Sequence, residues 1–356
     1  MAKIGVFSKF EMAGGSEFRC AEIANGIANY SNHESYLLAE KNLPQRIDEY
    51  TSDEVNKVDT VFMPDPKNAY LLYEMDILIV VNTDSKTLSH IDYWHGRSER
   101  HAQRMDLKRM GSMIFLFNFL VSPSRHLYTI EKEAKDVKIV TTNTKFFEEI
   151  TKEDRYDFVK HMPRLKVESP IDPNKYEKQK TPSEQIRFGM HSKGDKRKWN
   201  EEWPKLIEKC YERLGDRITF DFMGMPSKLG EKISSLPNVK VRKEHEISVS
   251  EFMQGIDVFT FFPSWEREEP WARVVGEAMI TGCPLLATNK GGNKDQIINH
   301  NNGFLCKRTD DFFKNIVYFT ENPEYISIMG RNSLGIARNF QTETIINRLL
   351  DFALYV

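Results

Sequence analysis

Two glutamates, Glu269 and Glu277, stand eight residues apart in the segment SWEREEPWARVVGEAMITGCP. Pro270 suits the first position of a helix, where its missing N–H is no loss. Gly282 suits the position after a helix end. We therefore predict a helix over Pro270–Thr281, with Glu269 in the loop before it and Glu277 two turns inside. Its other residues are largely apolar, which predicts that the Glu277 carboxylate is buried.

The start of such a helix offers backbone N–H groups and a partial positive charge, which suit a diphosphate. A buried carboxylate needs hydrogen-bond donors, and two vicinal ribose hydroxyls would supply them to Glu277. Glu269 could then reach the hydroxyls of a bound sugar. The structural alternative is that Glu269 lies on the surface and that Glu277 is a core residue paired with Arg273.

Two further segments combine glycine or basic residues with a strand end. The run RFGMHSKGDKRKW carries Lys193, Lys196, Arg197 and Lys198, which could neutralise a diphosphate leaving group. A solvated basic turn is the alternative. The glycines of Ala13–Glu17 (AGGSE) follow the first expected strand and would let the backbone approach an anion.

A histidine also stands at an expected strand end. His95 occurs in HIDYWHGRSER, and a structural role is the alternative to a catalytic one. The same region carries a cluster of basic residues that includes Arg97, Arg100 and Arg104. This cluster could contact an acceptor, or it could face solvent.

Short apolar runs alternate with longer amphipathic segments and would position these residues. Expected strands in the first half are Ile4–Phe7, Tyr36–Ala39, Thr60–Met63, Asp76–Val81, His90–Trp94, Phe119–Ser122 and Lys166–Ser169. The second half repeats the pattern with Ile186–Met190, Ile218–Met223, Val239–Arg242, Val258–Phe262 and Pro284–Ala287, and helices are expected at Ser16–Asn29, Trp203–Leu214 and Thr342–Tyr355. Alternation of this kind predicts parallel sheets covered by helices, twice over. Met110–Val121 reads as a buried strand or helix.

The polar segment Ile171–Gln185 separates the two halves. We predict an α/β protein of two Rossmann-like doubly wound domains facing across a cleft. The expected domains are 1–175 on the acceptor side and 176–340 for the nucleotide-sugar, with a C-terminal helix in 341–356 that packs back on the first.

Composition narrows the class of protein. The 356 residues are 40% hydrophobic and 29% charged, which is typical of globular domains. The net charge of −2 gives no overall field for nucleic acid or anionic membrane. The four cysteines lack metal-site spacing, no apolar run approaches the roughly 20 residues that span a bilayer, and the N-terminus reads as a strand. We expect a cytoplasmic protein with at most peripheral membrane contact.

The segment around the two glutamates resembles the E-x7-E motif of retaining GT-B glycosyltransferases of the family-4-like kind. The resemblance extends through E-A-M-x-x-G-x-P, the turn Gly291–Gly292 and the N-G-F-L at Asn302–Leu305. The family usually has Phe-Gly where this chain has Trp271–Ala272, and Arg where it has Met190. Whether Met190 lowers activity is not determined by the sequence.

The resemblance implies a role for each matching residue. Glu277 is implied to bind the nucleotide ribose, and His95 and Glu269 are implied to act as catalytic residues on the donor sugar. The residues implied to bind the rest of the donor are Gly14, Gly15, Lys193, Lys198, Trp271 and Ala272.

The resemblance also implies a reaction. A sugar would pass from a nucleoside-diphosphate sugar to an acceptor hydroxyl with retention of anomeric configuration. The sequence has no D-x-D pair, so we expect no metal and no cofactor beyond the sugar nucleotide. The donor base, the donor sugar and the oligomeric state stay open.

The acceptor is expected to be a glycan or a lipid-linked glycan. DNA with a hydroxymethylated base is the alternative, as in phage DNA glycosyltransferases, because Arg97, Arg100 and Arg104 could bind its phosphates. A rival of another class is a non-catalytic module that binds sugar nucleotides on the same fold, and a sugar-nucleotide epimerase is a third.

Overall fold

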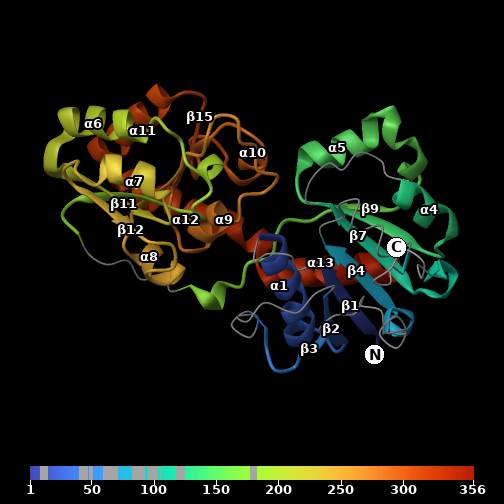
Figure 1. Ribbon diagram of the computed structural model, residues 1–356. Helices are drawn as coiled ribbons and strands as arrows, with labels where there is room; N and C mark the ends of the chain where they lie inside the picture. The colour runs from blue at the N-terminus through green and yellow to red at the C-terminus, as the bar shows by residue number, and fades with distance from the viewer. Residues whose placement is uncertain are drawn as a thin grey trace. The chain divides into compact units, whose positions relative to one another are not determined.

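The computed structural model describes residues 1–8, 15–39, 47, 51–58, 71–81, 93–94, 103–104, 106–117, 125–176 and 183–356. The chain divides into two compact units, each with its own parallel sheet (Figure 1). Unit 1 comprises Met1–Pro170 and Phe340–Val356, and unit 2 comprises Ile171–Asn339.

Within the described residues, the sheet of unit 1 has the order β3-β2-β1-β4-β7-β8-β9, and its strands are all parallel. These strands are β1 (Lys3–Ser8), β2 (Glu34–Ala39), β3 (Asn56–Val58), β4 (Ile77–Val81), β7 (Ser112–Phe117), β8 (Val137–Thr141) and β9 (Arg164–Lys166). Every residue of β4 is buried, as expected of a parallel strand with both faces covered.

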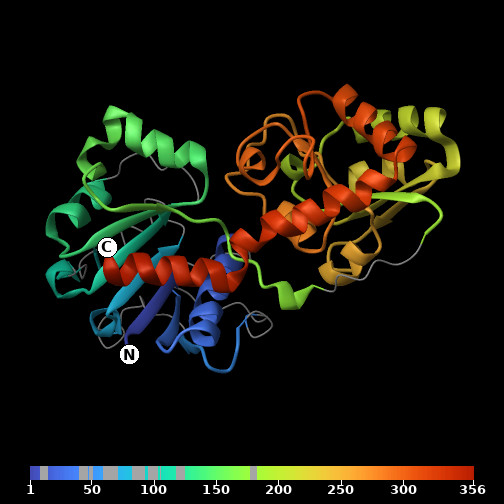
Figure 2. The same cartoon turned by 180° about the vertical axis from the view of Figure 1, so that it is seen from behind.

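The helices described in unit 1 are α1 (Gly15–Tyr30), α4 (Arg125–Glu133), α5 (Thr144–Lys152) and α13 (Thr342–Tyr355), with 3₁₀ turns η3 (Leu107–Arg109) and η4 (Asp154–Val159). Figure 2 shows α13 lying across the sheet of unit 1. It packs closely on α1, because a Cβ at Gly26 would lie 2.5 Å from Ile346 Cγ1. Lys138 Nζ donates to the carbonyl of Ala353 at 3.2 Å, which ties the end of α13 to β8.

The sheet of unit 2 has the order β12-β11-β10-β13-β14-β15, again with parallel neighbours. Its strands are β10 (Ile186–His191), β11 (Ile218–Met223), β12 (Val239–Arg242), β13 (Val258–Phe261), β14 (Leu285–Thr288) and β15 (Gly303–Cys306). The helices are α6 (Trp203–Leu214), α7 (Ser227–Ile233), α8 (Val249–Gln254), α9 (Arg273–Ile280), α10 (Asn293–Gln296), α11 (Thr309–Glu321) and α12 (Glu324–Ala337). Short 3₁₀ turns are η5 (Pro173–Lys175), η6 (Lys196–Lys198), η7 (Gly215–Arg217) and η8 (Arg338–Phe340).

Aromatic packing explains how α6 is held on the unit 2 sheet. Trp203, at the first turn of α6, is fully buried. Its indole ring lies 4.7 Å from the ring of Phe222 and 5.3 Å from that of Phe262. These edge-on contacts fix the start of α6 near the carboxyl ends of β11 and β13.

The prediction of two Rossmann-like α/β domains is confirmed, and several individual strands need correction. In the apolar run Met110–Val121 the strand is β7, Ser112–Phe117. The sequence analysis did not predict β8. Tyr93–Trp94 forms β5, which pairs antiparallel with β6 (Gln103–Arg104) and not with the main sheet. The strands expected at Thr60–Met63 and Phe119–Ser122 lie outside the described residues.

Candidate functional site

The carboxyl end of β10 leads into the basic segment of unit 2. Met190, at the position where the resembling family has Arg, is buried in the sheet. His191 ends the strand and Lys193 lies exposed just beyond it. The carbonyl of Lys193 accepts a hydrogen bond from Trp199 Nε1 at 2.9 Å, which shapes the loop that carries Lys198.

The loop after β13 packs against this basic loop. Asn200 donates through its backbone N–H to the carbonyl of Phe262 at 3.0 Å and through Nδ2 to that of Pro263 at 2.9 Å. Ser264 N donates to the carbonyl of Arg197 at 3.3 Å. The two loops therefore form one structure at the carboxyl ends of β10 and β13, where ligands of doubly wound sheets bind.

Glu269 lies in this structure as a buried carboxylate, 8% exposed. Its Oε1 accepts hydrogen bonds from Lys198 Nζ and, at 2.8 Å, from Arg267 Nε. Burial raises the pKa of Glu269, but the bond from Arg267 and the charge of Lys198 outweigh it and lower the pKa below its ordinary value. Glu269 is thus ionised and is contacted by two cationic side chains.

Two glycines hold the Glu269 loop in place. Gly292 N donates to the carbonyl of Glu269 at 2.8 Å. A Cβ at Gly291 would lie 2.2 Å from that carbonyl oxygen, and one at Gly292 would lie 2.0 Å from the carbonyl oxygen of Pro270. Gly291 also has a φ of +52°, which favours glycine. The Gly291–Gly292 turn is therefore required by backbone contact with the loop before α9.

Gly292→Ala should destabilise the protein by at least about 2 kcal/mol, because the new methyl group overlaps the Pro270 carbonyl. Gly335→Ala is the matched control, since a Cβ there meets nothing within 4 Å and Gly335 lies in α12. We expect it to be neutral or to stabilise by up to about 1 kcal/mol. Urea unfolding measures both, and equal free energies of unfolding for the two variants would contradict the close contact.

The helix that carries Glu277 begins later than predicted. It runs from Arg273 to Ile280, not from Pro270 to Thr281. Ala272 is held outside the helix because its N–H donates to Gln296 Oε1 at 3.2 Å and its carbonyl accepts from Gln296 Nε2 at 3.0 Å. The bond from Gly292 to Glu269 acts in the same direction. The Gln296 side chain and the Gly292 backbone, both distant in the sequence, thus override the helical preference of Pro270.

Glu277 is 6% exposed, and protein groups surround its carboxylate. Oε1 accepts from Tyr176 Oη at 3.0 Å and from Arg273 Nε at 2.9 Å. His191 Nε2 lies 3.1 Å from Oε2. The alternative in which Glu277 is a core residue requires the pairing with Arg273, and the structure contains this pair. The hydrogen-bond donors that a buried carboxylate needs are thus supplied by the protein.

These contacts should make part of the stability depend on pH. Burial opposes ionisation of Glu277, but His191 and Arg273 outweigh it, and Tyr176 adds a hydrogen bond, so that its pKa falls to about 2 from 4.5. A lowered pKa stabilises the folded state above pH 4.5, by on the order of 3 kcal/mol, and this contribution is lost as the pH falls towards 2. Urea unfolding should therefore show Glu277→Gln less stable than the parent at about pH 7, with a smaller difference at about pH 3. A difference that does not change with pH would contradict this.

Trp271 and Ala272, which were predicted to bind the donor, both make contacts within unit 2. The Trp271 indole is buried and packs on α9, since a Cβ at Gly276 would lie 2.4 Å from its Cη2 atom. The Ala272 N–H donates to Gln296 Oε1. The first amides of α9 therefore begin at Arg273.

Several predicted residues belong to unit 1. Gly14, His95, Arg97 and Arg100 lie outside the described residues. Gly15 is the first residue of α1, and Arg104 is the last residue of β6. Their roles stay predictions.

The sequence analysis missed three residues of the site. His191 stands at a strand end, just before the lysines and arginines that were predicted to bind phosphate. Tyr176 lies just after η5, in the segment interpreted as a linker. Arg267 precedes Glu269 by two residues and forms an ion pair with it.

Three observations bear on other kinds of site. Among the described residues, no group of three His, Cys, Asp or Glu side chains is placed to hold a metal ion. The four cysteines are all buried and free. In the same part of the chain, no helix has the length and apolar character that crossing a bilayer requires.

Fold and site together define the class of protein that the chain resembles. Residues 178–334, nearly the whole of unit 2, match the family model "Glycosyl transferases group 1". Structures of GT-B glycosyltransferases share the fold of the whole chain. The second unit is thus similar to group 1 glycosyl transferases, and the chain has the GT-B fold.

Particular proteins are similar to different extents. Trehalose synthase of Pyrococcus horikoshii is 26% identical over 125 residues, which are 35% of this chain and 29% of that enzyme. The chain thus matches less than a third of the length of that relative. Anabaena HepE, solved with UDP and glucose, aligns over 100% of both chains with a TM-score of 0.70 at 15% identity. A glycosyltransferase from Rickettsia africae aligns over 99% of this chain and 97% of its own with a TM-score of 0.75 at 13% identity.

Proposed function

We propose that the protein transfers a sugar from a nucleoside-diphosphate sugar to an acceptor hydroxyl with retention of anomeric configuration. The observation that carries the proposal is the pair of buried, ionised glutamates in unit 2. Glu269 lies beside Lys198, and Glu277 lies one turn beyond the start of α9. The match of residues 178–334 to the glycosyltransferase model supports the same activity.

Lys193 and Lys198 are proposed to bind the diphosphate of the donor. Lys193 is exposed at the carboxyl end of β10, and the Lys198 ammonium is partly exposed beside Glu269. The first amides of α9 add the partial positive charge of a helix start. Cations in this position stabilise the charge that develops on the diphosphate as the bond to the sugar breaks.

Glu277 is proposed to bind the ribose, and its contacts with the protein limit the number of ribose hydroxyls that it can accept. A carboxylate has about four lone-pair sites, and Tyr176, Arg273 and His191 approach three of them. One ribose hydroxyl could use the remaining site. A second hydroxyl would need to replace one of the protein donors, and Tyr176 is the uncharged phenol among them.

Glu269 is proposed to contact the donor sugar near the reacting carbon. The bond from the anomeric carbon to the phosphate oxygen breaks with its electron pair on the phosphate. The acceptor oxygen then bonds to the same face of the carbon, and its proton passes to the departing phosphate. A carboxylate beside the carbon stabilises the positive charge that develops on the sugar. His95, Gly14 and Gly15 are proposed to complete the donor site, and no metal is required.

The remaining parts of the proposal are the identity of the donor nucleotide and that of the acceptor. HepE was solved with UDP and with UDP-glucose, so uridine diphosphate sugars are the first donors to test. A glycan or a lipid-linked glycan is the proposed acceptor.

A panel of sugar nucleotides tests the function. We expect one nucleoside diphosphate and its sugar to raise the melting temperature, because a ligand of the native state stabilises it. We also expect slow release of nucleoside diphosphate when that donor is incubated without acceptor. A non-catalytic module would bind the donor and release none, and an epimerase would convert the donor sugar instead. Absence of binding by every sugar nucleotide would overturn the proposal.

A further inference from the structure

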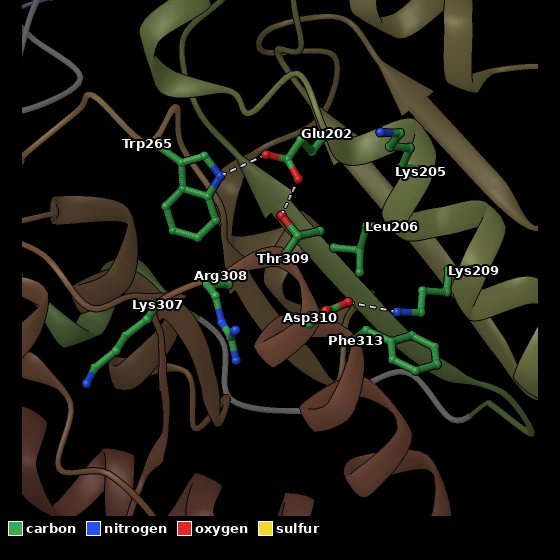
Figure 3. A pocket seen from close by; sticks show the side chains of 10 residues that line it. All are labelled: Glu202, Lys205, Leu206, Lys209, Trp265, Lys307, Arg308, Thr309, Asp310 and Phe313. Atoms are coloured by element: carbon green, nitrogen blue, oxygen red, sulfur yellow. Dashed lines mark hydrogen bonds and ion pairs between the residues drawn. The ribbon is translucent and has the colours of Figure 1, made fainter.

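A pocket of about 530 Å³ opens in unit 2 between the first turns of α6 and α11 (Figure 3). Its volume lies within the roughly 300–1,000 Å³ that is typical of small-molecule sites. It is separate from the residues assigned above to the donor. The residues that line it are Glu202, Lys205, Leu206, Lys209, Trp265, Lys307, Arg308, Thr309, Asp310 and Phe313.

Positive charge is in excess in the lining. Two carboxylates face four cations. Asp310 is already paired, since it accepts from Lys209 Nζ at 2.7 Å. Lys205 and Lys307 are exposed and, within the described part of the chain, have no ion pair inside 4 Å. These two ammonium groups are the charges that an incoming anion would meet.

Trp265 supplies a partly exposed aromatic ring held in one orientation. Its Nε1 donates to Glu202 Oε1 at 3.0 Å, and the other oxygen of Glu202 accepts from Thr309 Oγ1 at 2.5 Å (Figure 3). Phe262 packs edge-on against the indole at 5.4 Å. Glu202 is thereby committed to two neutral donors, and the ring is positioned before any ligand arrives.

The remaining lining is apolar or amphipathic. Leu206 and Phe313 border the pocket, and Lys209 Nζ lies 4.4 Å from the Phe313 ring centre. A bare inorganic anion would use the lysines but not these surfaces. A sugar ring has an apolar face for an aromatic side chain and hydroxyls for polar neighbours, so a saccharide that carries an anionic group matches the whole lining.

We propose that this pocket is a second binding site, for a saccharide bearing a phosphate or a carboxylate. Its anionic group binds one of the two exposed lysines, Lys205 or Lys307, which Figure 3 shows at opposite ends of the lining, and its ring lies against Trp265. The ligand is either a free sugar phosphate or the anionic unit of a longer glycan. Both share the same chemistry.

The pocket is connected to the loop that carries Glu269. Trp265 precedes Glu269 by four residues, and its carbonyl accepts a hydrogen bond from Lys290 Nζ. Arg267 N donates to the carbonyl of Ser264 at 2.9 Å, which makes the intervening segment a tight turn. A ligand on Trp265 would therefore contact the segment that leads to Glu269.

Isothermal titration calorimetry without any sugar nucleotide tests the site independently of the proposed function. We expect glucose 6-phosphate or glucuronate to bind at least about tenfold more tightly than either glucose or inorganic phosphate. Glucose lacks the anionic group, and inorganic phosphate lacks the ring that contacts Trp265. The double variant Lys205→Ala, Lys307→Ala should lose this preference. Lys232→Ala, which removes an exposed lysine of α7, is the matched control and should keep it.

Two further measurements distinguish a free sugar from a glycan and separate this proposal from the proposed transferase activity. Tighter binding of a glucuronate-containing tetrasaccharide than of glucuronate indicates a glycan, and equal binding indicates a free sugar. Glu269→Gln should bind the same probes, so loss of transfer in that variant does not affect this test. The proposal is overturned if neither charged sugar is preferred over glucose and phosphate, or if the double variant binds them as the parent does.

Discussion

Glu269→Gln should lower the rate of sugar transfer by about 100-fold or more while donor binding changes little. The amide keeps the size of the side chain and removes its charge, and a preorganised charge at the reacting carbon is typically worth a factor of 10² to 10³. The effect should appear in kcat and not in KM, because the charge on the sugar develops only in the transition state. Initial rates with saturating donor and acceptor measure it.

The same variant needs a control for the loss of two ion pairs. Lys198 and Arg267 both contact Glu269, so the substitution also costs stability, which urea unfolding measures separately. Glu266→Gln removes an exposed carboxylate from the same loop and should leave kcat unchanged. A folded Glu269→Gln protein with the kcat of the parent would rule out the proposed role.

Glu277→Gln should weaken binding of the nucleotide-sugar by about 10- to 100-fold. An ionised acceptor that bonds a ribose hydroxyl contributes about 1.5–3 kcal/mol, and an amide offers only one acceptor oxygen. The loss should appear in the dissociation constant of the donor and of the free nucleoside diphosphate alike. Calorimetric titration of both ligands measures it.

Two variants separate ribose binding from a purely structural role of Glu277. Asp221→Asn breaks a partly buried ion pair with Arg242 elsewhere in unit 2. It should lower the stability of the protein without weakening binding of the nucleotide-sugar. Tyr176→Phe removes one donor to Glu277 and leaves the carboxylate in place. We expect it to keep or strengthen donor binding, because an acceptor site becomes available to the ribose. If Glu277→Gln only destabilises the fold, Glu277 is the core residue of the structural alternative.

Local sequence patterns were sufficient for some of the regular elements. The bounds of α6, β11, β12 and α13 agree with the predicted ranges residue for residue. Each has a clear period of apolar residues and a recognisable end, and such signals depend on neighbours in the chain. The burial of Glu277 followed from the same reasoning, because a carboxylate on a largely apolar helix lies in the core.

The start of α9 shows where local reasoning failed. Pro270 has the local preference of a first helical residue, yet Gln296 and Gly292 hold residues 269–272 in another conformation. Gly291 and Gly292 were read as part of a family motif, and the contact that requires them became visible only in three dimensions.

The sequence by itself determined that the chain has two parallel α/β units and that Glu269 and Glu277 stand eight residues apart at the mouth of a helix. Only the tertiary structure decided what surrounds them: Lys198 and Arg267 on Glu269, and Tyr176, His191 and Arg273 on Glu277. The physical reason is range. Periodicity and capping act within a few residues, whereas the charge state of a buried carboxylate depends on groups up to about a hundred residues away that the sheet brings within hydrogen-bonding distance.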